Sequence, residues 1–567
     1  MAYDVLIKNG RVVDGSGMPS FHGDVAIKDG KIAEIGKLSG AASQTVDVGG
    51  QVIAPGFIDN HCHYDAQVTW DPLCSFSCDH GATSVVIGNC SLSLAPVRRG
   101  KEKRMAEFLS YVEAIPMEVL GTVEVDWETF PQYMERLDSN LGVNVGTLMG
   151  HTAIRYYVMD EDCQSRAATD DELKQMQLLV REGMDAGALG LSVSRNKGHY
   201  DPQGVHIPAL WADEKEIFAL AEVLGEMGTG ILQSGGGREA EMDSGLMARL
   251  SEATGRPVVY NNLGQSVRRP GQWKTHMDRV NETVAKGIRA YPLCSPNRTT
   301  QTFNMSNSQL WRGSPTWHPI LLASDDEKLK AYADPDVRRK LHDEMVEGSV
   351  VIPGGTIAKD WWNYIWVHEP VLEKNKWMIE KSLKEVADAE GKGIIDSFLD
   401  LVVEEKLETV FMQAENNVEE EAMRQILTYP NALIGLSDGG AHVQFHGGYG
   451  FSTRLLSEWV REKKAMTLEQ AVRRLTFDSA NTFGLYDRGL LRPGMKADIT
   501  VFDPDTVKPL PEFVVHDFPA GGWRFKEPAQ GIYCTFVNGQ MLMKEGNHTG
   551  NLPGRVLRNS RYQMSHA

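Results

Sequence analysis

Short runs of continuously apolar residues recur along the middle of the chain, separated by helix-like stretches. Eight such runs stand out, at residues 52–58, 83–87, 143–149, 188–193, 229–232, 257–260, 287–291 and 432–436. Strands that are buried on both faces of a parallel sheet have this unbroken apolar pattern, without the alternation of a half-exposed strand. Eight parallel strands with crossover helices predict an α/β fold, a distorted (β/α)₈ TIM barrel. An open, doubly wound sheet is the structural alternative, and the count of eight favours the barrel.

Both ends of the chain have a different sequence pattern, in which short β-branched runs are joined by tight turns. The turn dipeptides are Asn9-Gly10, Asp14-Gly15, Asp29-Gly30 and Asn538-Gly539. Asn-Gly and Asp-Gly between β-branched runs are strong hairpin signals. We expect residues 1–51 and 486–567 to pair into one small β-sandwich domain, with residues 52–485 forming the barrel.

The predicted strands are unevenly spaced. Helices are expected between them, for example over residues 170–186, where three acidic residues suit a helix start, and over 214–227. Roughly 140 residues separate the last two apolar runs, and a connection that long is usually a lid or an inserted subdomain. We place this insertion at about residues 295–430, before strand eight. It contains further predicted helices over 373–389 and 393–406.

Composition and charge narrow the class of protein. The 567 residues carry a formal net charge of −18. Nucleic acids and anionic membranes are bound by basic surfaces, so we expect neither as a partner. Seven cysteines in so long a chain do not make a disulfide framework, which leaves thiols available as metal ligands. With no visible secretory signal and no apolar run of roughly 18–20 residues, we expect a cytoplasmic protein.

Metal-binding residue types stand at the carboxyl ends of several predicted strands, where barrel enzymes build their sites. The first strand leads into His61-Cys62-His63. Residues i and i+2 of a strand point to the same side, so both imidazoles are expected to bind one ion. Cys90 follows the second strand and Asp438 follows the eighth. We predict a divalent metal site of these four residues, with Asp438 also acting as the catalytic acid and base.

Other polar residues near the strand ends are candidates for the same site. His442 follows soon after the eighth strand and is predicted as a further metal ligand, and His446 is expected to line the pocket. His151 follows the third strand and is predicted to bind substrate at the rim of the site. Arg155 and Arg195 are candidate contacts for an anionic group of the substrate.

Several short motifs form a combination that is specific when taken together. The longest is Pro55-Gly56-Phe57-Ile58-Asp59-Asn60-His61-Cys62-His63. The others are His80-Gly81-Ala82-Thr83, Gly88-Asn89-Cys90, Gly150-His151-Thr152-Ala153-Ile154-Arg155, Gly187-Ala188-Leu189-Gly190, Ser437-Asp438-Gly439, Asp487-Arg488-Gly489 and Pro493-Gly494-Met495-Lys496-Ala497-Asp498. The chain resembles the amidohydrolase superfamily over nearly its whole length, and in particular its D-aminoacylase, or N-acyl-D-amino-acid deacylase, branch. This resemblance implies a distorted barrel with a β domain made from both termini, and a cysteine at position 90 that ligates or bridges metal.

The chain departs from that branch at two strand ends. The branch has a histidine at the end of strand five and another at the end of strand six, where this chain has Gln233 and Asn262. Neutral amides are weak ligands for zinc, so both residues are assigned to substrate binding. The deacylase metal site is therefore not expected here unchanged. One or two divalent ions, zinc or iron, are compatible with the residues that remain.

Three functions fit these residues. The first is hydrolysis of an amide C–N bond of an N-acyl compound by metal-activated water. The second is oxygen chemistry, since barrel proteins that resemble amidohydrolases hold paired non-haem irons and hydroxylate acyl substrates, many of them CoA-linked. The third is a non-catalytic binding relic, with which the retained ligands His61, His63, Cys90 and Asp438 conflict. Superfamily resemblance favours hydrolysis of a small-molecule substrate by an enzyme that we expect to form a homo-oligomer.

Overall fold

A computed structural model describes the chain over residues 2–236, 240–306, 308, 310–311, 314–347, 357–444 and 448–566. The chain divides into two compact units. The larger comprises Met1–Leu263, Lys274–Asn297 and Arg424–Ala567, and the smaller comprises Gly264–Trp273 and Arg298–Met423. Within the described ranges, every helix is too short or too polar to cross a lipid bilayer.

The predicted parallel strands form one curled sheet in the larger unit, a distorted barrel, and the fold class is confirmed. Its eight strands, in chain order, are β6 (Phe57–Asp59), β7 (Ala82–Ile87), β8 (Asn144–Gly150), β9 (Gly190–Ser194), β10 (Ile231–Gly235), β11 (Val258–Tyr260), β12 (Ala290–Cys294) and β16 (Leu433–Ile434). They lie in sequence order across the sheet, and the short β25 (Val556–Leu557) adds to β8. Every residue of β7 and β8 is buried, as their unbroken apolar pattern predicts.

The interior of this curled sheet is packed with side chains. One apolar residue from each strand, or next to it, contributes to a single cluster: Ile58, Val86, Leu148, Leu189, Ile231, Val259, Leu293 and Leu433. Barrels of eight strands are filled in this way by layers of branched side chains, and burying each one stabilises the fold by about 1.5–3 kcal/mol. The barrel axis is therefore a core and not a channel.

The first and last strands of the sheet are joined just beyond their carboxyl ends. The side-chain amide of Asn60 donates to Ile434 O at 3.0 Å. The backbone N–H of Asp438 donates to His61 O at 3.2 Å, and that of His63 donates to Gly439 O at 2.6 Å. These bonds bring the segment after β6 and the segment after β16 together, which fixes the two ends of the predicted metal site relative to each other.

The prediction of one strand over residues 52–58 is wrong, because the segment forms two strands in different sheets. β5 (Val52–Pro55) pairs with strands from the chain ends, and β6 belongs to the barrel. Gly56 lies between them, and a Cβ added there would come within 2.0 Å of Thr83 Oγ1. The close approach at Gly56 lets the chain pass from one sheet to the other.

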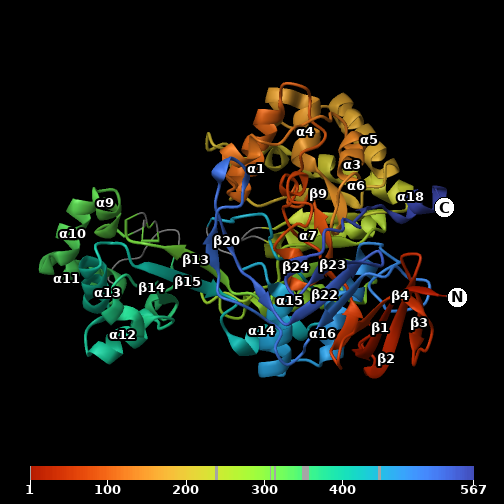
Figure 1. The fold of residues 1–567 in the computed structure, drawn as a ribbon. Helices are drawn as coiled ribbons and strands as arrows, with labels where there is room; N and C mark the ends of the chain where they lie inside the picture. The colour runs from red at the N-terminus through yellow and green to blue at the C-terminus, as the bar shows by residue number, and fades with distance from the viewer. Residues whose placement is uncertain are drawn as a thin grey trace. The chain divides into compact units, whose positions relative to one another are not determined.

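Segments from both ends of the chain combine in a second, mixed sheet of nine strands (Figure 1). Its strands are β1 (Tyr3–Val12), β2 (Phe21–Lys28), β3 (Lys31–Gly36), β4 (Ala42–Asp47), β5, β17 (Ile499–Phe502), β22 (Ile532–Val537), β23 (Gln540–Lys544) and β24 (Asn547–His548). Two further ribbons pair β18 (Lys508–Pro509) with β21 (Ala529–Gln530) and β19 (Phe513–Val515) with β20 (Arg524–Lys526).

Two of the predicted hairpin turns in this sheet are confirmed. Asp29-Gly30 joins β2 to β3 and Asn538-Gly539 joins β22 to β23, with positive φ at all four residues. The hairpin predicted at Asn9-Gly10 is wrong. β1 continues through this dipeptide, and the pairing of β1 with β2 shifts register between Ile7 and Gly10, so the dipeptide forms a bulge within a long strand.

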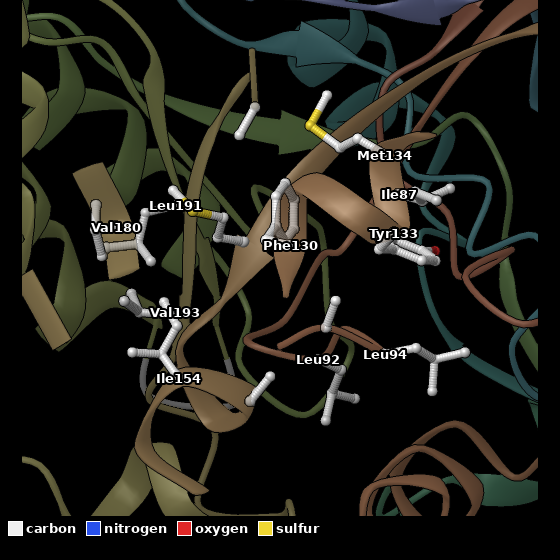
Figure 2. Close-up of a cluster of buried hydrophobic side chains, with 14 of the residues drawn as sticks. Ile87, Leu92, Leu94, Phe130, Tyr133, Met134, Ile154, Val180, Leu191 and Val193 are labelled. Carbon is white, nitrogen blue, oxygen red and sulfur yellow. The ribbon is translucent and has the colours of Figure 1, made fainter. Parts of the chain in front are cut away.

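Helices accompany the barrel strands. They are α1 (Glu102–Glu113), α2 (Met117–Leu120), α3 (Phe130–Leu137), α4 (His151–Met159), α5 (Asp170–Asp185), α6 (Glu214–Met227), α7 (Ala240–Thr254), α8 (Gln272–Ala285), α14 (Glu420–Thr428), α15 (Phe451–Arg454), α16 (Leu468–Leu475), α17 (Phe477–Thr482) and α18 (Ser560–Ser565). The predicted helices over 170–186 and 214–227 are confirmed by α5 and α6. Figure 2 shows Ile154 of α4 and Val180 of α5 close to Leu191 and Val193 of β9, within the main hydrophobic cluster.

The smaller unit has its own sheet and its own core. β13 (Thr299–Phe303), β15 (Val410–Asn416) and β14 (Ile365–Glu369) form an antiparallel sheet in that order. The unit's helices are α9 (Trp317–Leu321), α10 (Asp325–Ala333), α11 (Pro335–Met345), α12 (Leu383–Glu390) and α13 (Ile394–Glu404). Its tryptophans serve as packing residues, since the rings of Trp311 and Trp317 stack with centroids 4.3 Å apart inside the core.

The helix predicted over 373–389 is wrong in its first half. Glu373–Met378 forms a 3₁₀ helix, and Glu380 adopts a positive φ that ends it. Ser382 then caps α12 by accepting a hydrogen bond from the Glu385 N–H. The helix predicted over 393–406 is present as α13.

A candidate metal centre at the carboxyl ends of the barrel strands

Two histidines and a cysteine meet at the carboxyl ends of β6 and β7. His61, His63 and Cys90 are buried, and one ligand atom from each lies within 4.8 Å of the others. Cys90 Sγ is 3.5 Å from His61 Nε2, and the two imidazole rings have centroids 5.3 Å apart. The sequence predicts this meeting from residue types at strand ends, and the fold brings the three residues together.

Asp438 completes the cluster from the segment after β16. Its Oδ1 lies 3.3 Å from His63 Nε2 and 3.6 Å from His61 Nε2, and 36% of its side chain is exposed. Burial raises the pKa of the Asp438 carboxyl. Hydrogen bonding and charge from His63, with His61 and His442 nearby, outweigh that rise and hold the pKa below its usual range. The carboxylate is therefore ionised and faces both imidazoles.

Glu113, at the last turn of α1, lies beside the cluster and is absent from the sequence predictions. Its side chain is buried, with Oε1 at 3.4 Å from His63 Nδ1 and Oε2 at 3.9 Å from His442 Nε2. The His442 backbone N–H also donates to Glu113 O at 2.6 Å. Burial raises the pKa of the Glu113 carboxyl, and His63 and His442 oppose the rise. His63 thus has a carboxylate on each of its two ring nitrogens.

The charges around His63 favour a cation. Burial alone lowers the pKa of His63, but Glu113 and Asp438 raise it well above its ordinary value. Burial and the neighbouring His63 lower the pKa of His61 to about 3, so His61 is a neutral imidazole. Burial raises the pKa of the Cys90 thiol to about 11, against the opposing effect of His63. A divalent cation bound here would compensate the negative charges of Glu113 and Asp438. It would also favour the thiolate form of Cys90.

The donor set also fits a divalent metal chemically. His61 faces Cys90 Sγ and Asp438 Oδ1 with the same ring nitrogen, Nε2, at 3.5 and 3.6 Å. Two imidazole nitrogens, a sulfur and a carboxylate oxygen are the ligands that zinc takes in proteins, and imidazole and carboxylate also suit iron(II). The residues present can therefore hold such an ion.

Gln233 and Gly235 of β10 shape the backbone of Cys90. The Cys90 N–H donates to Gln233 Oε1 at 2.9 Å, and Cys90 adopts a left-handed φ of 54°, which is unfavourable for a residue with a side chain. A Cβ at Gly235 would come within 3.0 Å of both Cα and Sγ of Cys90. Gln233 is predicted as a substrate contact, but its buried amide oxygen is used to hold the cysteine.

Asn261, and not the predicted Asn262, approaches the cluster from the end of β11. Asn261 Nδ2 lies 3.4 Å from His61 Nε2 and 3.9 Å from Cys90 Sγ, whereas Asn262 is exposed. Val259 points into the barrel interior, so the residue two positions later points the same way. The period-two pattern of β11 was the available signal, and the choice of Asn262 as the site residue is corrected on this ground.

His151 and Arg155 form a buried network with Glu216 of α6. His151 Nε2 lies 2.7 Å from Glu216 Oε1, and Arg155 Nη1 donates to Glu216 Oε2. Arg155 Nη2 also donates to two backbone carbonyl oxygens, at 3.1 and 2.8 Å, and the side chain is fully buried. The predicted contact of Arg155 with an anionic substrate is therefore corrected, because its guanidinium is engaged inside the protein. The predicted rim position of His151 is corrected as well, since its ring is buried.

The remaining predicted residues have diverse positions. Arg195 follows β9, is half-buried, and donates from Nη1 to Ala212 O at 3.3 Å. His442 contacts Glu113, as described above, and His446 lies outside the described residues.

His199 is influenced by the charges of the metal cluster. Burial, and then the charge on His63, lowers the pKa of His199 to about 4, while Asp438 opposes this shift. Its Nδ1 lies 3.1 Å from Ser194 Oγ, at the end of β9.

The family model, a sequence relative and a solved structure all point to the amidohydrolases. The model of the amidohydrolase family matches residues 44–540. A D-aminoacylase of Alcaligenes xylosoxydans xylosoxydans is 30% identical over 98% of this chain and 97% of its own, and an uncharacterized protein of Mycobacterium tuberculosis is 30% identical over 89% and 85%. The fold is similar to that of an N-acyl-D-glutamate deacylase of Bordetella bronchiseptica in complex with zinc and a phosphonate inhibitor. That structure has a TM-score of 0.66 and 24% identity, and the match covers 98% of this chain and 100% of the other.

Proposed function

The chain belongs to the amidohydrolase family, and from this premise we propose that it hydrolyses an amide C–N bond of an N-acyl compound at the cluster of His61, His63, Cys90 and Asp438. The observation that carries the proposal is the position of Asp438. Its ionised carboxylate faces both histidines at 3.3 and 3.6 Å and remains partly exposed, so it can reach a substrate as well as the ligands.

We assign one divalent ion to His61, His63, Cys90 and Asp438. When bound, such an ion polarises a carbonyl oxygen and lowers the pKa of a water molecule. Gln233 and Asn261 stand at the strand ends where the deacylase branch has histidines, and they are hydrogen-bonded to or lie against Cys90. Because neutral amides are weak ligands and these two already serve the cysteine, the proposal is for one ion and not two.

Proton transfer is assigned to Asp438. A carboxylate whose pKa is held low by adjacent imidazoles is ionised at neutral pH and accepts a proton from the attacking water. Delivering that proton to the amide nitrogen allows the amine to leave. Glu113 is assigned a positioning role: it faces His63 Nδ1, and so directs Nε2 of that ring toward Asp438 and the cluster.

The substrate class proposed first is an N-acyl-D-amino acid. The relatives named D-aminoacylase and N-acyl-D-aspartate deacylase match 98% of this chain, at 30% and 28% identity. Such a substrate carries a carboxylate beside the scissile amide. Since Arg155 is engaged elsewhere, Arg195 and His199 after β9 are the proposed contacts for it.

The test is amine release from a panel of N-acyl-D- and N-acyl-L-amino acids by zinc-loaded protein. The proposal expects turnover of at least one D-series compound and loss of turnover by a factor of roughly 10² or more in Asp438→Asn, with the rates compared per bound zinc ion. Arg339→Gln, at an exposed position of α11, is the control for any general effect of substitution and purification on turnover. Absence of amine release across the panel contradicts the substrate class, and full activity of Asp438→Asn contradicts the assignment of that residue.

A second candidate function rests on the contact between Glu113 and His442. A carboxylate and an imidazole on the far side of His63, with Asp438 and His61 on the near side, form a donor set that suits a dinuclear non-haem iron oxygenase. That function requires dioxygen as a co-substrate and two irons per chain. Dioxygen uptake by iron-loaded protein with an acyl-CoA would support it and would displace hydrolysis as the proposed reaction.

A further inference from the structure

A cavity of about 660 Å³ lies at the end of the barrel opposite to the metal cluster. Its wall includes Thr229 and Gly230 just before β10, Pro257 just before β11, and Leu433 at the start of β16. The metal cluster is built from the carboxyl ends of the strands, whereas these residues are at the amino ends. The packed layer of apolar side chains along the barrel axis separates the two ends, so the cavity is not part of the site for amide hydrolysis.

The wall of this cavity is strongly basic in a chain whose net charge is −18. It contains four arginines, Arg256, Arg289, Arg473 and Arg474, and one acidic residue, Asp478. Asp478 Oδ1 pairs with Arg473 Nε at 3.0 Å, and its Oδ2 lies 3.9 Å from Arg474 Nε. The single carboxylate is therefore shared by the two arginines of α16, and Arg256 and Arg289 are not neutralised by it.

Arg256 and Arg289 are held in place by backbone carbonyl groups. Arg256 donates to Gly230 O at 3.1 Å and to Gly228 O at 2.7 Å, and Arg289 donates to Gly255 O. In the described parts of the chain, no carboxylate lies within ion-pair distance of either guanidinium. Arg256 precedes β11 and Arg289 precedes β12, and these two strands pair directly, with the Val258 N–H donating to Arg289 O at 2.8 Å. The charge of Arg289 also contributes, after burial, to the lowered pKa of Arg256. Two fixed, adjacent positive charges are thus left facing the cavity.

Four aromatic residues are among those that line the rest of the wall. They are Tyr291, Phe477, Phe483 and Tyr486; Phe483 is buried, whereas Tyr486 is 63% exposed. Guanidinium pairs bind phosphate through paired N–H groups, and flat apolar groups stack on aromatic rings. The volume is that of a site for a small organic molecule. A dianionic phosphate matches two adjacent guanidiniums better than a single carboxylate does.

We propose that this cavity binds a phosphorylated small molecule that carries a flat ring, of the nucleotide class, with Arg256 and Arg289 holding the phosphate. The inference is independent of the proposed hydrolysis, because it concerns other residues at the other end of the barrel.

The test is isothermal titration calorimetry of the full-length protein with ADP as the probe, alongside adenosine and inorganic phosphate. The proposal expects one ADP per chain, with at least tenfold weaker binding of adenosine and of inorganic phosphate. Arg289→Gln and Arg256→Gln are each expected to weaken ADP binding at least tenfold. Arg339→Gln, which removes the same charge from an exposed helix position, is expected to leave it unchanged.

Arg256 is half-buried, so its variant is checked by circular dichroism and thermal unfolding, and Arg289→Glu, at an exposed position, gives the same test without disturbing the core. ADP binding that is unchanged in Arg289→Glu overturns the proposal, as does no heat of ADP binding to the unaltered protein. Equal affinity for ADP and inorganic phosphate overturns the assignment to a ligand with a flat ring.

Discussion

Gln233 accepts a hydrogen bond from the backbone N–H of Cys90, with 2.9 Å between the two atoms. The residue at the end of strand five, where the deacylase branch has a histidine, thus supports a ligand of the proposed metal instead of binding the ion itself. The bond holds Cys90 in a left-handed conformation that carries its thiol toward His61. Strand five therefore contributes to the site through the hydrogen bond of Gln233 to Cys90.

Replacing Gln233 with alanine tests this relationship. The substitution leaves the buried Cys90 N–H without its acceptor, which costs about 1–3 kcal/mol of the free energy of unfolding. It also loosens Cys90, so zinc affinity is expected to fall, as measured by competition with a chelator. Gln177→Ala is the matched control, because Gln177 makes one bond to a backbone carbonyl, Ala219 O at 2.9 Å, away from the cluster. Unchanged zinc affinity in Gln233→Ala would contradict the supporting role.

Glu113→Gln tests the carboxylate behind His63. The substitution keeps the shape of the side chain and removes its negative charge from His63 Nδ1. Loss of a carboxylate behind a ligating histidine typically weakens metal affinity by about 10–100-fold, and that is the expected change in the zinc dissociation constant. Glu405→Gln provides the control, since Glu405 is a buried carboxylate of the smaller unit. If both variants bind zinc as the parent does, Glu113 has no positioning role.

Cys90→Ser tests the thiolate ligand by spectroscopy. Cobalt(II) bound to a thiolate gives an intense near-ultraviolet charge-transfer absorption that oxygen ligands do not give. The parent protein and Cys163→Ser, altered at another buried free cysteine, are expected to show this absorption after cobalt loading, and Cys90→Ser is expected to lack it. Its presence in Cys90→Ser would exclude Cys90 as a ligand.

Asn261 and Asn262 offer a comparison of neighbouring positions. Asn261→Ala removes the amide that lies 3.4 Å from His61 Nε2 and is expected to change both zinc affinity and turnover. Asn262→Ala alters an exposed side chain and is expected to leave both within about twofold, because surface substitutions usually change stability by less than about 0.5 kcal/mol. The opposite ranking would restore the assignment to Asn262.

Much of the site could be predicted from the sequence because strand ends and ligand types are local features. The unbroken apolar runs at β7 and β8 mark buried parallel strands, and His61, His63, Cys90 and Asp438 follow such runs or close them. The alternation of side-chain directions along β11 could also be predicted from the sequence. Since Val259 points into the barrel, the residue two positions later, Asn261, points the same way.

Other features depend on the tertiary fold and leave no local sign. Glu113 stands near the end of an amphipathic helix, where a glutamate normally faces water, and only the packing of α1 beside His63 and His442 buries it. The change of sheet at Gly56 depends on the close approach of Thr83, which comes from another strand. Arg155 belongs to a conspicuous motif, but the partner that engages it, Glu216, is on a later helix.

The most direct test of the proposed hydrolysis measures amine release from an N-acyl-D-amino acid by zinc-loaded and by iron-loaded protein, each under argon and in air. Hydrolysis at a single metal centre predicts equal rates under both conditions, with one amine released per acyl group and no dioxygen consumed. Product formation that stops under argon, with dioxygen uptake in air, would contradict the proposed hydrolysis.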